Sequence, residues 1–177
     1  MDFEQAVGHE LEWRQPDACG RVHQLTQDGR EVGSLRFETS LGSRATGECG
    51  PGKWTFKRTG FLSPRVSVRE AGSDTDIAIF TPSWTGSGWV AFSAGRRYHL
   101  RPTNFWATEW AFETADGTPA ISVRGPHGLF KQGGYATVAQ TVAGLPEAPV
   151  LLLLIWYLRV LMNEDASAVA ATVVACS

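Results

Sequence analysis

The sequence predicts a mainly β protein, a closed antiparallel β-barrel of roughly twelve strands that encloses a hydrophobic C-terminal α-helix. Three observations lead to this prediction. Between residues 8 and 142 short segments of alternating apolar and polar residues follow one another, and turn sequences separate them. Near the C-terminus, residues 150–162 are apolar on every side except at Arg159. We therefore expect one domain over residues 1–177, with the barrel at 8–142, the central helix at 146–163 and a tail at 164–177.

The predicted strands follow from period-two alternation, which places one set of side chains in a core and the other in water. Leu11 and Trp13, for example, alternate with charged neighbours. The same pattern recurs around Leu35 and Phe37, Trp54 and Phe56, and Val66 and Val68, and in the segments DIAIF, GWVAF, RRYHL, FWATEWAF, AISVR and YATVAQTV. Turn sequences such as QDGR, EAGSD, TGSG and ADGT separate the strands. So many consecutive strands leave two exposed edges unless the sheet closes, which favours a barrel.

The helix at 146–163 has a place inside such a barrel, because a wide barrel is not filled by its own side chains. Pro146 and Pro149 suit a helix start, and Glu147 lies near the positive end of the helix dipole. Residues 150–162 would extend about 20 Å, which matches the depth of a barrel. A helix that is apolar on every side has to be buried on every side. The sequence thus predicts a helix that plugs the barrel.

A membrane span is the alternative interpretation of this segment. A bilayer needs about 20 predominantly apolar residues. Here Arg159 interrupts the apolar run, polar residues close it at 163–165, and charges within lipid are costly. We therefore expect no transmembrane span. Arg159 is expected either to reach the barrel mouth near the C-terminal end of the helix or to be buried with an acidic partner. The tail ASAVAATVVACS continues the helix, forms a second helix or adds a strand.

Composition excludes several classes of function. The net charge of −2 provides no field that would attract nucleic acid. Cys19, Cys49 and Cys176 are odd in number and lack CxxC spacing, so we expect neither disulfides nor a zinc site, and a cytoplasmic location. The acidic N-terminal segment MDFEQAVGHE does not resemble a signal peptide. The four histidines show no metal-binding spacing, and no nucleotide-binding glycine motif occurs. We expect no metal, no cofactor and no catalytic residue.

A row of basic residues is the main candidate for binding. If Trp54 and Phe56 face inward with Val66 and Val68, the alternation places four cations on the outer face of one hairpin and leaves Arg58 at its turn. We call the five residues Lys53, Lys57, Arg58, Arg65 and Arg69 the basic row. Such a row can hold an anionic lipid headgroup. It can equally be a solvated face with acidic neighbours.

Two further groups of residues have two interpretations each. Arg97, His99 and Arg101 share one face of a predicted strand, where they either extend the anion site or are simply solvated. Trp84, Trp89, Trp106 and Trp110 either fill the core or face a cleft or a membrane interface. Trp106 and Trp110 are separated from Phe112 by even numbers of residues. In one strand all three side chains would lie on the same face, which favours the core for both tryptophans.

The layout of the chain resembles the tubby C-terminal-like superfamily, which includes tubby domains, LURP-one-related proteins and phospholipid scramblases. The resemblance lies in GKWTFKRTGFLSPRVSVRE, in GRRYHLRPTNFWATEWAFETADGTPAISVRG and in the helix PEAPVLLLLIWYLRVL. It implies a barrel threaded by its helix and, in some branches, phosphoinositide binding or lipid movement. The tubby signature blocks, the calcium-binding segment and the lipidated cysteine stretch of scramblases are missing. The chain looks closest to the LURP-one-related branch, and no functional residue carries over.

Three functional hypotheses follow. The leading one is a non-enzymatic barrel that binds anionic phospholipid or phosphoinositide headgroups, or a protein partner, at the basic row. Lipid binding would place the cytoplasmic protein peripherally at a membrane. The second is an intracellular carrier of a small apolar ligand, which requires an empty barrel interior. The third is an enzyme with an unrecognised site, which requires a cleft where histidine and carboxylate side chains converge.

Overall fold

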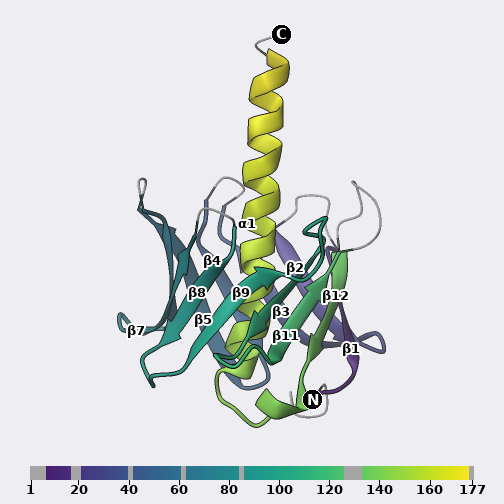
Figure 1. Cartoon of the computed structure of the whole chain (residues 1–177), viewed down its shortest axis with the longest axis vertical. Coiled ribbons are helices and arrows are strands. Elements are labelled where there is room, and N and C mark those ends of the chain that lie inside the picture. The colour runs from purple at the N-terminus through teal and green to yellow at the C-terminus, as the bar shows by residue number, and fades with distance from the viewer. Residues whose placement is uncertain are drawn as a thin grey trace.

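A computed structural model describes residues 7–16, 21–39, 42–60, 63–83, 86–125 and 133–175, with the side chains of the C-terminal helix described as far as Ser167. Within these residues the predicted fold class is confirmed: twelve antiparallel strands form a closed barrel around one C-terminal helix (Figure 1). The strands are β1 (Glu10–Arg14), β2 (Val22–Gln27), β3 (Arg30–Phe37), β4 (Ala45–Cys49), β5 (Gly52–Thr59), β6 (Arg65–Glu70), β7 (Asp76–Pro82), β8 (Gly88–Phe92), β9 (Arg97–Pro102), β10 (Glu109–Glu113), β11 (Pro119–Arg124) and β12 (Gly133–Val138).

The barrel closes through β1 and β12, where Leu11 lies opposite Ala136, so the sheet keeps no free edge. Every strand pairs with the strands that precede and follow it in the chain. Because neighbouring strands run in opposite directions, the connections β1–β2, β3–β4, β5–β6, β7–β8, β9–β10 and β11–β12 share one end of the barrel. The remaining connections share the other end.

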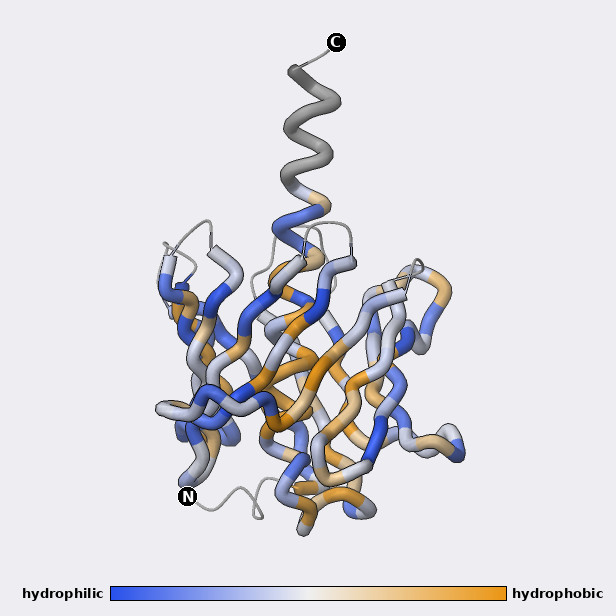
Figure 2. The backbone as a smooth tube through the Cα atoms, turned by 90° about the vertical axis from the view of Figure 1, so that its left-hand side faces the viewer, coloured by the Kyte–Doolittle hydropathy of each residue, from blue (hydrophilic) through white to orange (hydrophobic). Residues whose placement is uncertain are grey.

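The helix α1 (Ala148–Ala175) follows β12 and the 3₁₀ turn η2 (Gln140–Val142), and it runs along the inside of the barrel (Figures 1 and 2). Close to its start, Glu147 accepts a 2.7 Å bond from Arg96 of the β8–β9 connection. Farther along, Asp165 binds Arg58 near the end of β5. The helix therefore enters at the end that holds the β8–β9 connection, called here the helix-entry end. It leaves at the end that holds the β5–β6 connection, called the helix-exit end.

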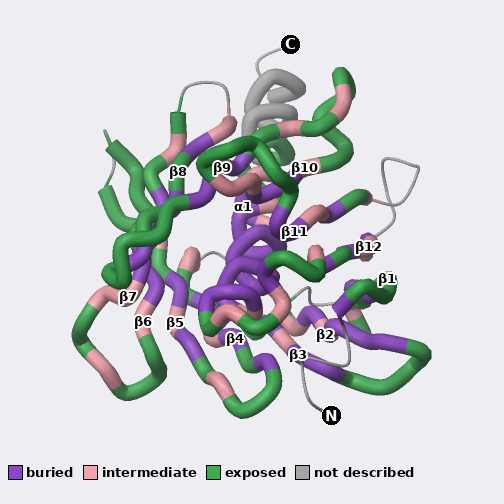
Figure 3. The backbone as a smooth tube through the Cα atoms, turned by 60° about the horizontal axis from the view of Figure 1, so that its bottom comes forward, coloured by how far each residue is buried: buried purple, intermediate pink, exposed green. Residues whose placement is uncertain are grey.

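Burial of the helix agrees with its sequence. Every side chain at 150–158 is at most 5 % exposed, and the helix lies in the buried centre of the barrel (Figure 3). The interior that an apolar-ligand carrier would need is thus occupied by α1. The helix begins at Ala148 rather than at Pro146, and its first bond runs from the Leu151 N–H to the Glu147 carbonyl at 2.9 Å. Pro149 lies in the first turn, where a missing N–H costs nothing.

Aromatic rings fill much of the space between the helix and the wall. Trp156 stacks on Trp13 of β1 with ring centroids 5.1 Å apart. Tyr157 lies between Phe37 and Phe56, at 5.7 Å and 5.5 Å, and its hydroxyl donates to the Ser43 carbonyl. Offset aromatic stacking adds stabilisation beyond that of buried area alone. Burial also raises the pKa of the Tyr157 hydroxyl, so this group stays protonated and continues to donate.

Two glycines of the wall lie directly beside side chains of the helix. A Cβ on Gly47 of β4 would lie 3.0 Å from Leu153 and 2.9 Å from the Phe56 ring. A Cβ on Gly134 of β12 would lie 2.9 Å from Trp156. Close approach of the wall to the helix therefore depends on a missing side chain at both positions.

Beyond the barrel, the helix continues without interruption to Ala175, and Figure 1 shows this part projecting past the strands. Of the alternatives for the tail, continuation of the helix is therefore the one observed. Residues 163–167 are exposed. Arg159 lies sixteen residues before the helix end, so it is not in the last turn, where the dipole would favour it.

The strand boundaries differ from the sequence-based prediction at four places. Val22–Gln27 and Ala45–Cys49 are strands that the sequence analysis did not predict, because their alternation is short or interrupted by glycine. Residues 105–108, predicted as the start of a strand, lie in the β9–β10 connection, since β10 begins at Glu109. The end of the YATVAQTV segment leaves β12 at Val138 and forms η2.

Cys49 provides a test of the closed wall. It is 2 % exposed, and burial raises the pKa of its thiol to about 12. Only the thiolate reacts with disulfide reagents. We expect a Cys19→Ser/Cys176→Ser variant to react with such a reagent only after it unfolds in guanidinium chloride. Stoichiometric labelling of the native variant at neutral pH would show that the wall opens at β4.

Candidate functional site

The basic row lies mainly on the outer face of the β5–β6 hairpin. Buried and exposed residues alternate along both strands, with Phe56 opposite Val68 on the inside. Lys53, Lys57, Arg65 and Arg69 consequently point outward. Arg58 differs, because it lies within β5 opposite the buried Val66 and not at a turn. The structure thus places four of these five side chains on one outer face.

Acidic neighbours already neutralise part of that face. Lys53 lies 2.6 Å from Glu48 of β4. Arg69 binds Asp76 of β7 at 2.5 Å and lies 3.8 Å from Asp74. The hydrogen bond with Asp76 raises the pKa of Arg69. Exposed ion pairs contribute little to stability, but they cancel the charge that an anionic ligand would meet.

Arg58 binds the C-terminal helix. Its two terminal nitrogens donate to the two carboxylate oxygens of Asp165 at 2.6 Å and 3.3 Å, and this bond raises the pKa of Arg58. Such a forked arrangement is the strongest geometry for an arginine–carboxylate pair. It ties α1 to β5 at the helix-exit end.

Lys57 and Arg65 are the members of the basic row that have no such partner. Among the described residues, no carboxylate lies within 4.0 Å of either side chain. Lys57 lies close to the end of β5, and Arg65 is the first residue of β6. Both are exposed, and both lie toward the helix-exit end.

The second basic cluster surrounds a tryptophan. Trp89 of β8 lies opposite His99, and the two rings stack at 4.5 Å. Arg97 lies over the same tryptophan at 5.2 Å, while Arg101 pairs with Glu113 at 3.5 Å. Trp89 is 39 % exposed, so of the two interpretations of this residue the core is the one that does not hold. The side chains of this cluster, on the side wall of the barrel, are therefore already engaged with Trp89 or with Glu113.

An exposed aromatic pair is the feature that sequence analysis placed incorrectly. Phe105 is 92 % exposed and Trp106 is 79 % exposed, although the pattern predicts Trp106 in the core. That prediction was wrong because period-two alternation holds only within a strand. Phe105 and Trp106 lie in the β9–β10 connection at the helix-exit end. Trp110 is partly buried and packs against the core, whereas Trp84 lies outside the described residues.

Hydrogen bonds shape the connection that carries this pair. The Asn104 side chain accepts from the Thr108 N–H at 3.0 Å and donates to its hydroxyl at 2.7 Å. The Trp110 indole donates to the Ala107 carbonyl at 2.9 Å. The loop is therefore braced at its base while its two rings stay in solvent.

The two ends of the barrel differ in the sequences of their connections. The helix-entry connections are polar turns such as Asp28–Gly29 and residues 114–118, and none contains an aromatic residue. At the helix-exit end, the connecting sequences contain Phe61, Trp84 and Phe130 in addition to the Phe105–Trp106 pair. Of these aromatic residues, Phe105 and Trp106 are the ones whose side chains the structure describes.

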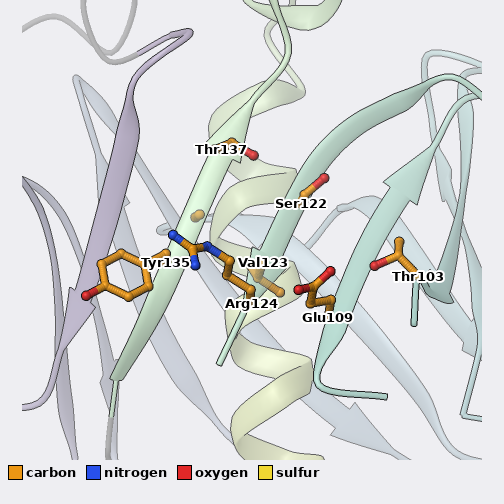
Figure 4. Close-up of a pocket in the computed structure, with 8 residues that line it drawn as sticks. Thr103, Glu109, Ser122, Val123, Arg124, Tyr135 and Thr137 are labelled. Carbon is orange, nitrogen blue, oxygen red and sulfur yellow. The ribbon is translucent and has the colours of Figure 1, made fainter. Parts of the chain in front are cut away.

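A small pocket of about 210 Å³ lies on the outer wall across β10, β11 and β12 (Figure 4). Its polar groups already contact one another. Arg124 lies 4.7 Å from the Tyr135 ring centroid and donates to Glu10, which raises the pKa of Arg124. A second pocket, of about 410 Å³, opens beside Arg96 and Leu145 at the helix-entry end. Neither of these described pockets is lined by a histidine or a cysteine. The smaller one lies below the usual size of a ligand site.

Other findings on function are negative within the described part of the chain. No group of three or more His, Cys, Asp or Glu side chains is arranged there to hold a metal ion. Among the described residues, no helix combines the length and the apolar character that a membrane span requires. Comparison of the chain with protein-family models, curated proteins and solved structures found no match.

Proposed function

We propose that this protein is a non-enzymatic barrel that attaches peripherally to anionic membrane surfaces through its helix-exit end. The observation that carries the proposal is the exposed Phe105–Trp106 pair on a braced loop at that end. Tryptophan and phenylalanine are favoured at the boundary between lipid headgroups and acyl chains. The polar turns of the helix-entry end offer no comparable contact.

The positions of the unpaired cations also favour membrane attachment through the helix-exit end. Lys57 and Arg65 lie toward it and have no carboxylate partner among the described residues. A basic residue near an anionic leaflet contributes about 1 kcal/mol. Two cations and two aromatic rings therefore suit reversible attachment, and we propose a peripheral location at the membrane on this basis.

Membership of the tubby C-terminal-like superfamily remains part of the proposal. A twelve-stranded barrel threaded by a hydrophobic C-terminal helix is the layout that the resemblance implies. Lipid binding in some branches of that superfamily agrees with the proposed function. The carrier hypothesis is not carried forward, because α1 occupies the interior that it requires. For the enzyme hypothesis, neither of the two pockets described above brings histidine and carboxylate side chains together.

Vesicle co-sedimentation at low salt tests this proposal. The wild-type protein is expected to bind phosphatidylcholine vesicles that contain phosphatidylserine, and to bind less as salt screens the charges. Lys57→Glu/Arg65→Glu is expected to weaken binding at least about tenfold, from the contribution of two surface cations. Phe105→Ser/Trp106→Ser is expected to weaken binding to a similar extent.

Matched variants separate the two ends and the side wall. Arg30→Glu/Lys53→Glu makes the same charge change near the helix-entry end, and Trp89→Ser removes an exposed ring from the side wall. Both are expected to bind like the wild type. Failure of the wild type to bind the anionic vesicles at low salt would refute the proposal and favour a protein partner. Equal losses in the matched variants would refute the assignment to the helix-exit end.

A further inference from the structure

Arg159 lies half-buried at the helix-exit end, between α1 and the wall. Its Nη1 donates to the Thr108 carbonyl at 3.3 Å, and the same carbonyl accepts the Gly125 N–H at 3.0 Å. Gly125 is so close that a Cβ there would lie 2.1 Å from Nη2 of Arg159. The guanidinium group therefore occupies a space that the missing side chain of Gly125 leaves open.

The charge of Arg159 is not neutralised within the described part of the chain. No described carboxylate lies within 4.0 Å of it, whereas Arg58, Arg69, Arg96, Arg101 and Arg124 all have such a partner. Arg159 contacts the Trp156 ring at 5.8 Å and one carbonyl, although a guanidinium group has five N–H donors. Burial lowers the pKa of Arg159, which reflects the cost of holding this cation partly out of water.

The segment that follows Gly125 supplies no negative charge. Residues 126–132, which follow Gly125, read PHGLFKQ and contain no acidic residue. Three acidic residues lie outside the described ranges, namely Asp2, Glu4 and Asp17. Of these, Asp17 alone belongs to a connection of the helix-exit end. An external anion is therefore the fitting partner for Arg159, with Asp17 as the internal competitor.

We infer that Arg159 binds the phosphate group of a lipid headgroup at the base of the Phe105–Trp106 loop. Thr108, which orients the guanidinium group, follows Trp106 by two residues, so rings that enter the headgroup region bring phosphate groups toward Arg159. A guanidinium group suits this role because its planar fork matches two phosphate oxygens. That the phosphate group belongs to a lipid rests on the proposed function. A free phosphate ion offers the same chemistry without a membrane.

NMR on the full chain tests the phosphate contact directly. The Arg159 Nε–H signal, assigned by its loss in Arg159→Gln, is followed while inorganic phosphate or a soluble short-chain phosphatidylserine is added. A chloride titration at matched ionic strength serves as the control. The signal is expected to shift saturably with the short-chain lipid and to stay in place with chloride. A signal that moves with neither phosphate source would overturn the inference.

Vesicle binding tests the lipid source with two variants. Arg159→Gln removes the charge and is expected to weaken binding to anionic vesicles by about tenfold, a usual effect of one charge-assisted hydrogen bond. Gly125→Ala keeps the charge but displaces the guanidinium group, and it is expected to weaken binding as well. Both variants are expected to unfold with the same cooperativity as the wild type, because the displaced group is the flexible end of a side chain.

The outcomes separate the inference from the proposed function. If wild-type protein binds vesicles and Arg159→Gln binds equally well, the inference fails and the proposed function stands. If phosphate shifts the Arg159 signal but no variant or wild type binds vesicles, the phosphate contact stands, its source is free phosphate, and the proposed function fails. A double-mutant cycle for unfolding with Asp17→Asn and Arg159→Gln provides the last check. Strong coupling would identify Asp17 as the partner and overturn the inference.

Discussion

Replacement of Leu153 by alanine is expected to lower the free energy of unfolding by about 2–5 kcal/mol. Leu153 is fully buried in the part of α1 that fills the barrel. Its side chain lies beside Gly47 of β4, where a Cβ would be 3.0 Å from it. The loss therefore combines the transfer free energy of the removed atoms with the cost of the cavity that remains. Equilibrium unfolding in urea, followed by circular dichroism, measures this change.

Asn163→Ala is the control for Leu153→Ala. It changes an exposed residue of the same helix beyond the barrel and is expected to alter the free energy of unfolding by less than about 0.5 kcal/mol. A Leu153→Ala variant as stable as the wild type would contradict the position of α1 as the core of the barrel. The cavity would then lie in a region where the helix is not enclosed.

Substitution of Gly47 by valine is expected to destabilise the protein by about 1–3 kcal/mol. The new side chain would meet Phe56 at 2.9 Å and Leu153 at 3.0 Å before any branch is added to its Cβ. Valine has a higher β-strand propensity than glycine, which by itself would stabilise β4. A loss of stability in Gly47→Val would therefore come from the steric contacts. Gly144→Ala, at a position with nothing within 4 Å of the added Cβ, is the control and is expected to be close to neutral. Thermal and urea unfolding report the difference.

The Leu153→Ala and Gly47→Val changes are expected to interact when combined. Leu153→Ala opens the space that the new valine side chain requires, so the double variant is expected to lose less stability than the sum of the single losses. Strict additivity would show that Gly47 and Leu153 are not in contact, and it would contradict the position of the helix beside β4.

The fold was predictable from the sequence because two strong signals agreed. Alternation such as that of Trp54 and Phe56 assigned residues to the inner wall, and a helix that is apolar on every side required an enclosure. The prediction failed where the chain leaves the sheet. In a continuous strand Trp106 and Phe112 would lie on the same face. Trp106 lies in a loop, however, where alternation does not decide which side chains are buried. The sequence pattern does not mark that β10 begins only at Glu109.

The candidate site was less predictable, since its properties depend on contacts between distant residues. Arg58 was assigned to the basic row, but it binds Asp165, a partner 107 positions away. Lys53 and Arg69 point outward as expected, yet their acidic neighbours come from β4 and β7. For Arg159, the sequence left open whether the residue reaches the barrel mouth or is buried with an acidic partner, and the structure places it half-buried at the helix-exit end, beside a carbonyl and a ring. No local pattern contains this information.

The order of wall and plug along the chain has a consequence for biosynthesis. All twelve strands described leave the ribosome before α1, and β1 has to wait for β12 to close the ring. At about 5–20 residues per second, the nascent wall spends seconds without the helix that forms its core. During that interval its apolar inner face and open edges are exposed to other chains. Cellular folding of this protein is therefore expected to be largely post-translational and to need chaperones that shield an unfilled barrel.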